Sequence, residues 1–208
     1  MRTIVAAALL CVMLALLLPL LFSGGGQAEP EAEREAEGAG ELDSELAFTV
    51  LTEGEVKTVT MSDWLPGVVA GEMPASFEPE ALKAQAVAAR TYIMYAMGRE
   101  KPAHPEADVC DDPGCCKAHS TDEALRENWG GDYDANMQKI LSAVRSTDGE
   151  YMSYGGEVIQ AVFHSSSAGR TEDSAAIWQA EPYLVSVESP ETADDVPNYV
   201  SSVTVSPE

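Results

Sequence analysis

Glu72 is the first residue in this sequence whose type and setting suit acid chemistry. It lies in the apolar segment 67–74, which reads GVVAGEMP. A carboxyl among apolar residues is partly desolvated, and desolvation favours the protonated form. A position at the negative, C-terminal end of a helix has the same effect. General acid catalysis requires that protonated form, so Glu72 is a candidate general acid; a surface glutamate near a turn is the alternative interpretation.

A second group of residues has the side chains of a metal site. His104, Cys110, Cys115 and Cys116 lie in one stretch without apolar periodicity, with His119 as a reserve ligand. Thiolates and imidazoles in fours are typical ligands of tetrahedral Zn²⁺, and a structural metal would order a long loop. A disulfide is the alternative outside the cytoplasm, but it leaves one of the three cysteines of this stretch unpaired. We expect a structural zinc site that is separate from the acid.

The elements that position Glu72 follow from the pattern of apolar residues. Ranges 48–51 and 56–59 flank a Glu-Gly pair and predict a β-hairpin. A helix is expected from 64 to 71, capped by Asp63. It ends there because the residue before a proline disfavours the helical conformation. Glu72 is therefore expected at a helix C-terminus.

The rest of the chain alternates between helical and hairpin patterns. Apolar residues at spacings of three and four predict a helix over 79–97. The stretch 100–131 is expected to be a long loop, and Asp134 is expected to cap a third helix that reaches residue 144. Ranges 150–154 and 157–163 predict a second hairpin around a Gly-Gly pair. The fold class predicted is α+β, a single mixed helix and β-hairpin domain after an N-terminal transmembrane helix.

The N-terminal residues 1–22 are expected to anchor the chain in a membrane. No charged residue occurs from Ile4 to Phe22, and about 20 apolar residues span a bilayer as a helix. A cleaved signal peptide is the alternative, although its apolar region is usually only about 7–15 residues long. The acidic residues that follow place the remainder outside the cytoplasm in this interpretation.

Three parts of the chain follow from these patterns. They are the anchor over 1–22, an acidic disordered linker over 23–44 and a globular domain over 45–208. The formal net charge of −23 argues against nucleic acid as a partner, because phosphate binding requires clustered Lys and Arg.

Three segments of the sequence resemble one protein family. Segment 67–92 (GVVAGEMPASFEPEALKAQAVAARTY) resembles the signature of the stage II sporulation protein D family, which amidase enhancers share. Segments 163–172 (FHSSSAGRTE) and 182–190 (PYLVSVESP) resemble the same family. The resemblance covers the chain from about Phe48 to its end, and family members are typically longer.

The resemblance implies a peptidoglycan lytic transglycosylase that acts during engulfment in sporulation. In that reaction an acid, matched here by Glu72, protonates the oxygen that links N-acetylmuramic acid to N-acetylglucosamine. The C6 hydroxyl of the muramic acid then attacks the anomeric carbon and gives a 1,6-anhydro product. A second carboxylate is not required, unlike in ordinary glycosidases.

The family motif also contains Arg90, on the helix expected over 79–97. If this side chain is buried it requires a carboxylate or carbonyl partner. Two interpretations follow: Arg90 holds Glu72 or the lactyl group of a sugar by a charge-assisted contact, or it forms a structural ion pair. We expect the first, with Arg90 in the catalytic site.

The set His164, Ser165, Ser166 and Gly169 is expected to bind sugar or line the cleft. A Ser–His dyad is not expected, because adjacent residues of a strand point to opposite faces. Zinc-bearing family members also resemble the loop at His104, Cys110 and Cys116, with Cys115 where their pattern often has His. The resemblance further implies glycan strands as substrate, and an engulfment amidase or endopeptidase as partner.

Two rival functions remain at this point. Amidase-enhancer proteins carry a similar domain and are interpreted as binding the wall or stimulating an amidase without cutting glycan. A zinc-stabilised interaction module between membranes is the other. Glu72 favours the enzyme, because a binding module has no need of the acid.

Overall fold

The computed structural model of the chain describes residues 41–194, 196 and 199–204. The expected membrane anchor and residues 23–40 of the expected linker lie outside this range. Across the described residues, no helix is both long and apolar enough to cross a membrane. The described part is α+β, as predicted, with helices and short sheets in one compact unit.

The predicted first hairpin is confirmed. β1 (Ala47–Thr52) pairs antiparallel with β2 (Glu55–Thr60) around Glu53 and Gly54, whose φ angles of 54° and 80° suit a tight hairpin turn. The opposite edge of β1 pairs in parallel with the two-residue strand β3 (Val109–Cys110). The sheet order is therefore β2-β1-β3, with β1 in the centre.

Helix α4 (Met61–Glu72) starts directly after β2. Its N-cap is Thr60, whose Oγ1 accepts the N–H of Asp63 at 3.2 Å. The prediction that Asp63 is the cap is wrong, because the last strand residue already has the extended conformation of an N-cap. The predicted helix end is confirmed: Met73 is extended, so Glu72 is the last helical residue.

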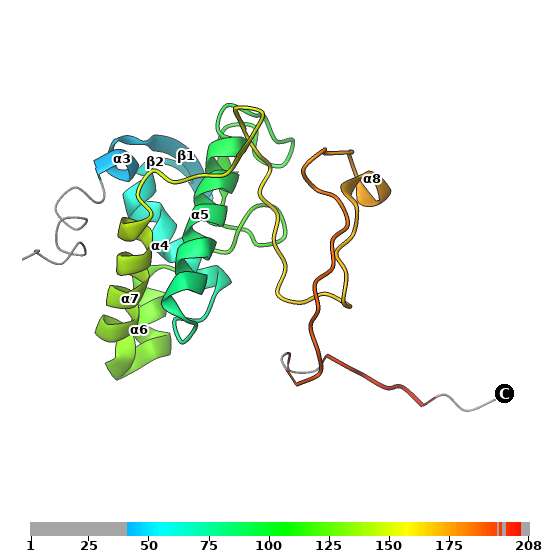
Figure 1. Cartoon of the computed structure of the whole chain (residues 1–208). Coiled ribbons are helices and arrows are strands. Elements are labelled where there is room, and N and C mark those ends of the chain that lie inside the picture. Colours follow the sequence, from blue (N-terminus) through cyan, green and yellow to red (C-terminus); the bar gives the residue numbers. More distant parts are fainter. Residues whose placement is uncertain (1–40, 195, 197–198, 205–208) are drawn as a thin grey trace, which may run out of the picture. The chain divides into compact units, whose positions relative to one another are not determined.

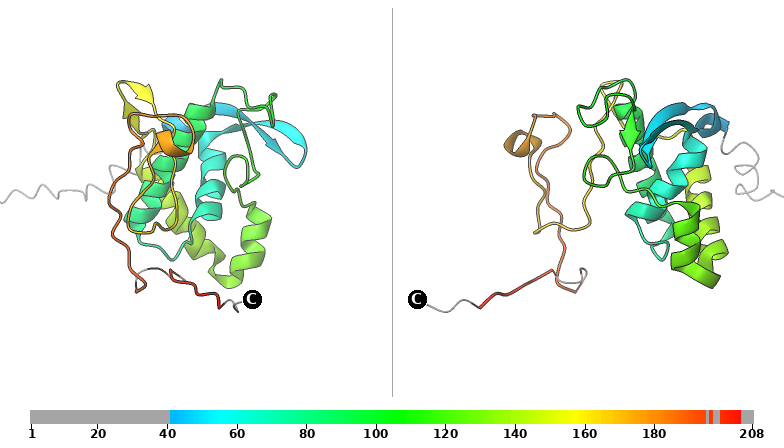
Figure 2. Two further views of the ribbon diagram at one scale, coloured as in Figure 1. Left: turned by 90° about the vertical axis from the view of Figure 1, so that its right-hand side faces the viewer. Right: turned by 180° about the vertical axis from the view of Figure 1, so that it is seen from behind.

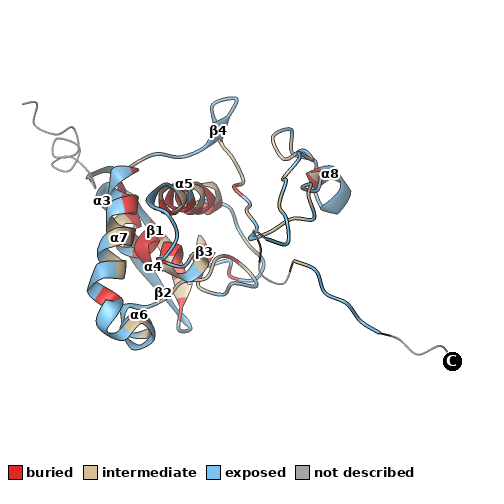
Figure 3. Ribbon diagram, turned by 60° about the horizontal axis from the view of Figure 1, so that its bottom comes forward, coloured by how far each residue is buried: buried red, intermediate tan, exposed pale blue. Residues whose placement is uncertain are grey.

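Three helices form the core. α5 (Pro79–Ala96) and α7 (Tyr133–Ser146) pack against each other and against α4. The β1–β2 hairpin lies across one end of these helices (Figures 1 and 2). Figure 3 shows buried residues along α4 and α5. The most buried apolar side chains include Leu65, Val68, Leu82, Ile93 and Ile140.

The stretch predicted as loop contains a helix. α6 (Asp122–Trp129) is capped by Thr121, whose Oγ1 accepts the N–H of Ala124 at 3.2 Å. Leu125 is the single buried residue of this helix, and its other residues are mostly charged or polar, so the segment resembles a polar loop in sequence. The 3₁₀ turn η1 (Gly130–Asp132) leads directly into α7, and Asp134 therefore lies inside the first turn of α7 and is not its cap.

The fold begins inside the expected linker. Helix α3 (Glu41–Glu45) contains Asp43, which is 2% exposed. The carboxylate of Asp148 accepts the backbone N–H groups of Leu42 and Asp43 at 3.0 and 2.9 Å. The predicted linker end at residue 44 is therefore too late. The acidic, polar composition of this segment is typical of a solvated linker, and it gives no sign that the Asp43 carboxylate is buried.

The C-terminal part has little regular structure. The predicted second hairpin is present as two short strands, β4 (Ser153–Tyr154) and β5 (Glu157–Val158). A short helix, α8 (Ser174–Ile177), follows. The phenol of Tyr183 accepts the backbone N–H of Gln160 at 3.1 Å, which ties the segment after α8 to the residues after β5.

Candidate functional site

Glu72 lies where α4 meets a loop from another part of the chain. Its side chain is partly buried, and Oε1 accepts the backbone N–H of Ala118 at 2.9 Å. Oε2 has no hydrogen-bond partner among the described residues. Because Oε1 accepts the Ala118 N–H, Oε2 is the carboxyl oxygen that remains available to a ligand. A carboxyl that is held at one oxygen and open at the other has the geometry that a general acid needs.

Two glycines of the family motif allow the loop to approach α4. A side chain at Gly67 would meet the His119 imidazole and lie 2.8 Å from the carbonyl oxygen of Ser120. A side chain at Gly71 would lie 3.1 Å from the carbonyl of Ala118. The backbone N–H of Ser120 also donates to the carbonyl of Gly67 at 3.0 Å. The glycines thus explain how Ala118 reaches Glu72.

Lys117 is the cation beside Glu72. Its ammonium lies 4.7 Å from the ring centroid of Tyr92 and 3.9 Å from that of Phe163. Burial lowers the pKa of Lys117, and the negative charge of Glu72 opposes this shift. The side chain therefore joins α5, the segment after β5 and the candidate acid.

The four predicted metal ligands lie together. One potential ligand atom from each of His104, Cys110, Cys115 and Cys116 lies within 4.8 Å of the others. All but Cys115 are buried. The distance from His104 Nε2 to Cys116 Sγ is 3.2 Å. One imidazole and three thiols at these separations form a donor set for a tetrahedral metal, with no position left open.

The surroundings of the cluster also suit a metal. His104 Nδ1 lies 2.8 Å from the carbonyl oxygen of Ala107, so Nδ1–H can donate there and leave Nε2 as the ligand atom. Burial opposes ionisation of Cys116, but hydrogen bonds from the Cys110 backbone and from Lys101 outweigh it and lower the thiol pKa to about 6. Burial raises the pKa of the Cys110 thiol to about 12. A thiolate at Cys116 is the form that binds a metal.

The metal is not the sole means of ordering this loop. The carboxylate of Asp108 accepts the backbone N–H and the hydroxyl of Thr49, and the N–H of Gly98. The Thr52 hydroxyl donates to the carboxylate of Asp111 at 2.6 Å. These contacts and the β1–β3 pairing fix the loop to the sheet in addition to any metal.

His119 lies outside the cluster. Its imidazole stacks on Trp64 with ring centroids 3.6 Å apart. Burial lowers the pKa of His119 to about 4, and Asp111 opposes the shift. The suggested role as a reserve ligand is therefore not supported, because the stack holds His119 against α4.

Arg90 is structural. Its guanidinium is fully buried and forms an ion pair with Asp43, with Nη2 to Oδ2 at 2.6 Å. Its five N–H groups have acceptors in Asp43, Thr147 and the backbone carbonyls of Val144 and Glu150. The prediction that Arg90 holds Glu72 or a sugar is wrong, because no donor remains for either.

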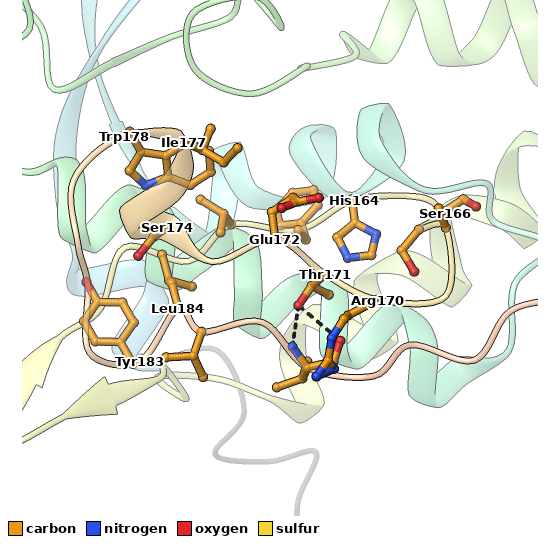
Figure 4. A pocket seen from close by; sticks show the side chains of 16 residues that line it. His164, Ser166, Arg170, Thr171, Glu172, Ser174, Ile177, Trp178, Tyr183 and Leu184 are labelled. Carbon is orange, nitrogen blue, oxygen red and sulfur yellow. Dashed lines mark hydrogen bonds between the residues drawn. The ribbon is translucent and has the colours of Figure 1, made fainter.

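The predicted sugar-binding set lines a cavity only in part. A cavity of about 640 Å³ has His164 and Ser166 in its wall, but not Ser165 or Gly169 (Figure 4). Trp178 also lines this cavity and is 54% exposed. Gly169 has φ 87° and turns the chain, which explains a glycine there without a binding role.

Three contributors to these sites were not predicted. Ala118 acts through its backbone, which has no side-chain signature in the sequence. Lys117 directly follows Cys115 and Cys116, and no motif in the sequence distinguishes it from other surface lysines. Glu191 accepts the N–H of Ser167 at 2.9 Å, and this hydrogen bond lowers the pKa of Glu191. No local pattern links Glu191 to a turn 24 residues earlier.

These features define a class of protein. It is an α+β domain in which a partly buried glutamate at a helix end lies close to a His–Cys cluster. Residues 51–154 match the stage II sporulation protein (SpoIID) family, and this match extends over half of the 208-residue chain. The chain belongs to that family.

Individual relatives are similar over the same region. The chain is 42% identical over 137 residues to stage II sporulation protein D of Bacillus subtilis (strain 168), which covers 65% of this chain and 40% of that protein. It is 37% identical over 123 residues to the amidase enhancer of the same organism, covering 58% of this chain and 14% of that protein. The chain thus spans less than half the length of either relative.

Proposed function

We propose that this protein is a peptidoglycan lytic transglycosylase of sporulation that uses Glu72 as general acid. The observation that carries the proposal is the hydrogen bond from Ala118 to Oε1, which fixes the carboxyl and leaves Oε2 free. The similarity to stage II sporulation protein D supports a role in sporulation. The proposal places the domain outside the cell membrane, tethered through residues 1–22, with an engulfment amidase or endopeptidase as partner.

The reaction needs one carboxyl in two protonation states. Oε2–H of Glu72 donates its proton to the glycosidic oxygen as the bond from that oxygen to the anomeric carbon breaks. The C6 hydroxyl of the same muramic acid attacks the anomeric carbon, and its proton returns to the Glu72 carboxylate. The products are a 1,6-anhydro sugar and a free 4-hydroxyl on the leaving sugar, and Glu72 is regenerated. The fixed hydrogen bond at Oε1 keeps the carboxyl oriented in both steps.

The His–Cys cluster is proposed to hold structural Zn²⁺. The ligands would be His104 Nε2 and the sulfur atoms of Cys110, Cys115 and Cys116. Borderline-soft Zn²⁺ matches one imidazole and three thiolates better than Ca²⁺ or Mg²⁺, which prefer oxygen. When bound, the metal would act as a cross-link between β3 and the turn that precedes Lys117.

Replacing Glu72 with Gln tests the proposal most directly. The amide keeps an oxygen for the Ala118 N–H, so the fold is maintained, but it removes a general-acid contribution of about 10²–10⁴-fold. Mass spectrometry of digested glycan should show 1,6-anhydro ends with the parent protein and none with Glu72→Gln. Glu78→Gln is the matched control, because Glu78 is exposed at the N-cap of α5 and its side chain makes no capping hydrogen bond.

The same digests separate the rival functions. Reducing ends in place of anhydro ends indicate a hydrolase. The similarity to an amidase enhancer supports a second candidate, a wall-binding protein that stimulates an amidase. In that case the parent protein binds glycan without cutting it, and Glu72→Gln stimulates the amidase as well as the parent does. An active Glu72→Gln enzyme with unchanged anhydro product contradicts the catalytic assignment.

A further inference from the structure

The ammonium of Lys117 differs from those of the other lysines. The other four, at positions 57, 83, 101 and 139, each donate to an acceptor of the chain. Within the described part of the chain, Lys117 has no hydrogen-bond acceptor. Its ammonium lies near two aromatic rings and interacts electrostatically with Glu72, Lys101 and Cys116. Such a cation is unusual in a protein with 35 acidic and 12 basic residues.

The two rings fix this ammonium without occupying its donors. Tyr92 and Phe163 lie 4.7 and 3.9 Å from Nζ, on different segments of the chain. Ring faces attract a cation through their quadrupole, but an ammonium has three N–H groups that seek oxygen acceptors. Lys117 is partly buried, so water can satisfy these donors only in part. A ligand with an anionic oxygen would satisfy them fully.

The location of Lys117 connects this ligand to the reaction. The next residue, Ala118, holds Glu72 by its N–H, and the Lys117 charge interacts with the Glu72 carboxylate. A group bound at Lys117 therefore lies beside the bond on which Glu72 acts. The net charge of −23 repels an anionic glycan in general, so a fixed cation at the site supplies the local attraction.

We propose that Lys117 is a specificity-determining residue that binds a carboxylate carried directly by the sugar that Glu72 cleaves. This inference rests on the proposed function. Muramic acid has a lactyl ether whose carboxyl is ionised when it is free and neutral when an amide joins it to a stem peptide. Lys117 thus favours muramic acid whose carboxylate is free.

The test measures glycan binding by protein that does not cut. Glu72→Gln protein is titrated calorimetrically with peptide-free glycan strands, and with the same strands after their lactyl carboxylates are converted to methylamides. The charged strands should bind about tenfold more tightly, as expected for one charge-assisted hydrogen bond. Adding Lys117→Met, which keeps an apolar stem between the rings, should abolish this preference. Adding Lys117→Arg should retain it.

The outcomes of this titration distinguish a failure of the Lys117 assignment from a failure of the proposed function. Equal binding of both strands by Glu72→Gln protein overturns the role of Lys117 and leaves the glycosidase intact. A preference that persists in the Lys117→Met variant assigns the carboxylate to another residue and also overturns it. Failure of Glu72→Gln protein to bind either strand contradicts the proposed function itself. Unchanged metal content in both Lys117 variants serves as the control, because Cys116 is adjacent.

Discussion

The backbone N–H of Ala118 donates to Oε1 of Glu72 at 2.9 Å, and Ala118 follows Cys116 by two residues. The sequence suggested that the acid and the metal site are separate devices. The structure shows that a two-residue segment joins them. Displacement of Cys116 therefore moves the donor that orients Glu72, and the two sites are mechanically coupled.

Metal content and activity should therefore fall together. Purified protein is expected to contain about one equivalent of zinc, and Cys110→Ser or Cys116→Ser should lose it. The fold should weaken without being lost, because Asp108 and β3 also hold the loop. The rate of glycan cleavage should fall strongly even where the free energy of unfolding changes little, because loss of the metal displaces Ala118, whose N–H orients Glu72. Elemental analysis, denaturant unfolding and glycan digestion measure the three effects.

Two variants serve as controls for the metal. His119→Phe and Glu72→Gln should both keep zinc, because neither side chain belongs to the cluster. Folded, active parent protein without metal, or a disulfide between Cys110 and a later cysteine, contradicts the zinc assignment.

Gly67→Ala should displace the loop that contains Ala118, because the added methyl group on α4 would collide with that loop. The added methyl would lie 2.8 Å from the Ser120 carbonyl oxygen and would also meet His119, which the stack on Trp64 holds in place. Overpacking of this kind costs about 1–3 kcal/mol, and displacement of the loop should also reduce cleavage. Denaturant unfolding and glycan digestion test both effects. Gly131→Ala is the control, because nothing lies within 4 Å of a side chain there.

Asp43→Ala should cost far more stability than its place in an acidic segment suggests. It leaves the buried guanidinium of Arg90 without its counter-charge, which typically costs about 3–5 kcal/mol. The exposed neighbour Glu45 provides the control, since Glu45→Ala should change stability by about 0.5 kcal/mol or less. Urea unfolding compares the two. Deletion through residue 40 should likewise be tolerated, whereas deletion through residue 45 should not.

Acid should weaken the fold through His119. Burial lowers the folded-state pKa of His119 to about 4, below its ordinary value of 6.5. The unfolded chain therefore binds a proton that the folded chain does not, and stability decreases as the pH falls from about 6.5 towards about 4. Urea midpoints at pH of about 7 and about 5 should differ less in His119→Phe than in the parent. An equal difference in both proteins assigns the acid sensitivity elsewhere.

Sequence patterns predicted the features of the fold and site that depend on a short segment of the chain. The proline after Met73 ends α4, which places Glu72, and the residue types of the cysteine loop were enough to group the four cluster residues. The Ala-rich period likewise located α5.

Contacts between distant residues could not be predicted in this way. Asp43 lies 47 residues before Arg90, in a stretch whose composition is typical of a solvated linker. Ala118 contributes only an N–H group, which every residue except proline possesses. The two-residue strand β3 is too short for a period, and it exists because β1 offers an unpaired edge.

The buried ion pair of Asp43 and Arg90 also determines how the domain would respond to a pull. The chain enters the fold through its core, because Arg90 binds Asp43 and, on the other side, the carbonyl of Val144 in α7. Tension applied ahead of residue 41 would therefore act first on α3, and through Asp43 on the guanidinium of Arg90 in α5, before it reached a strand of the sheet.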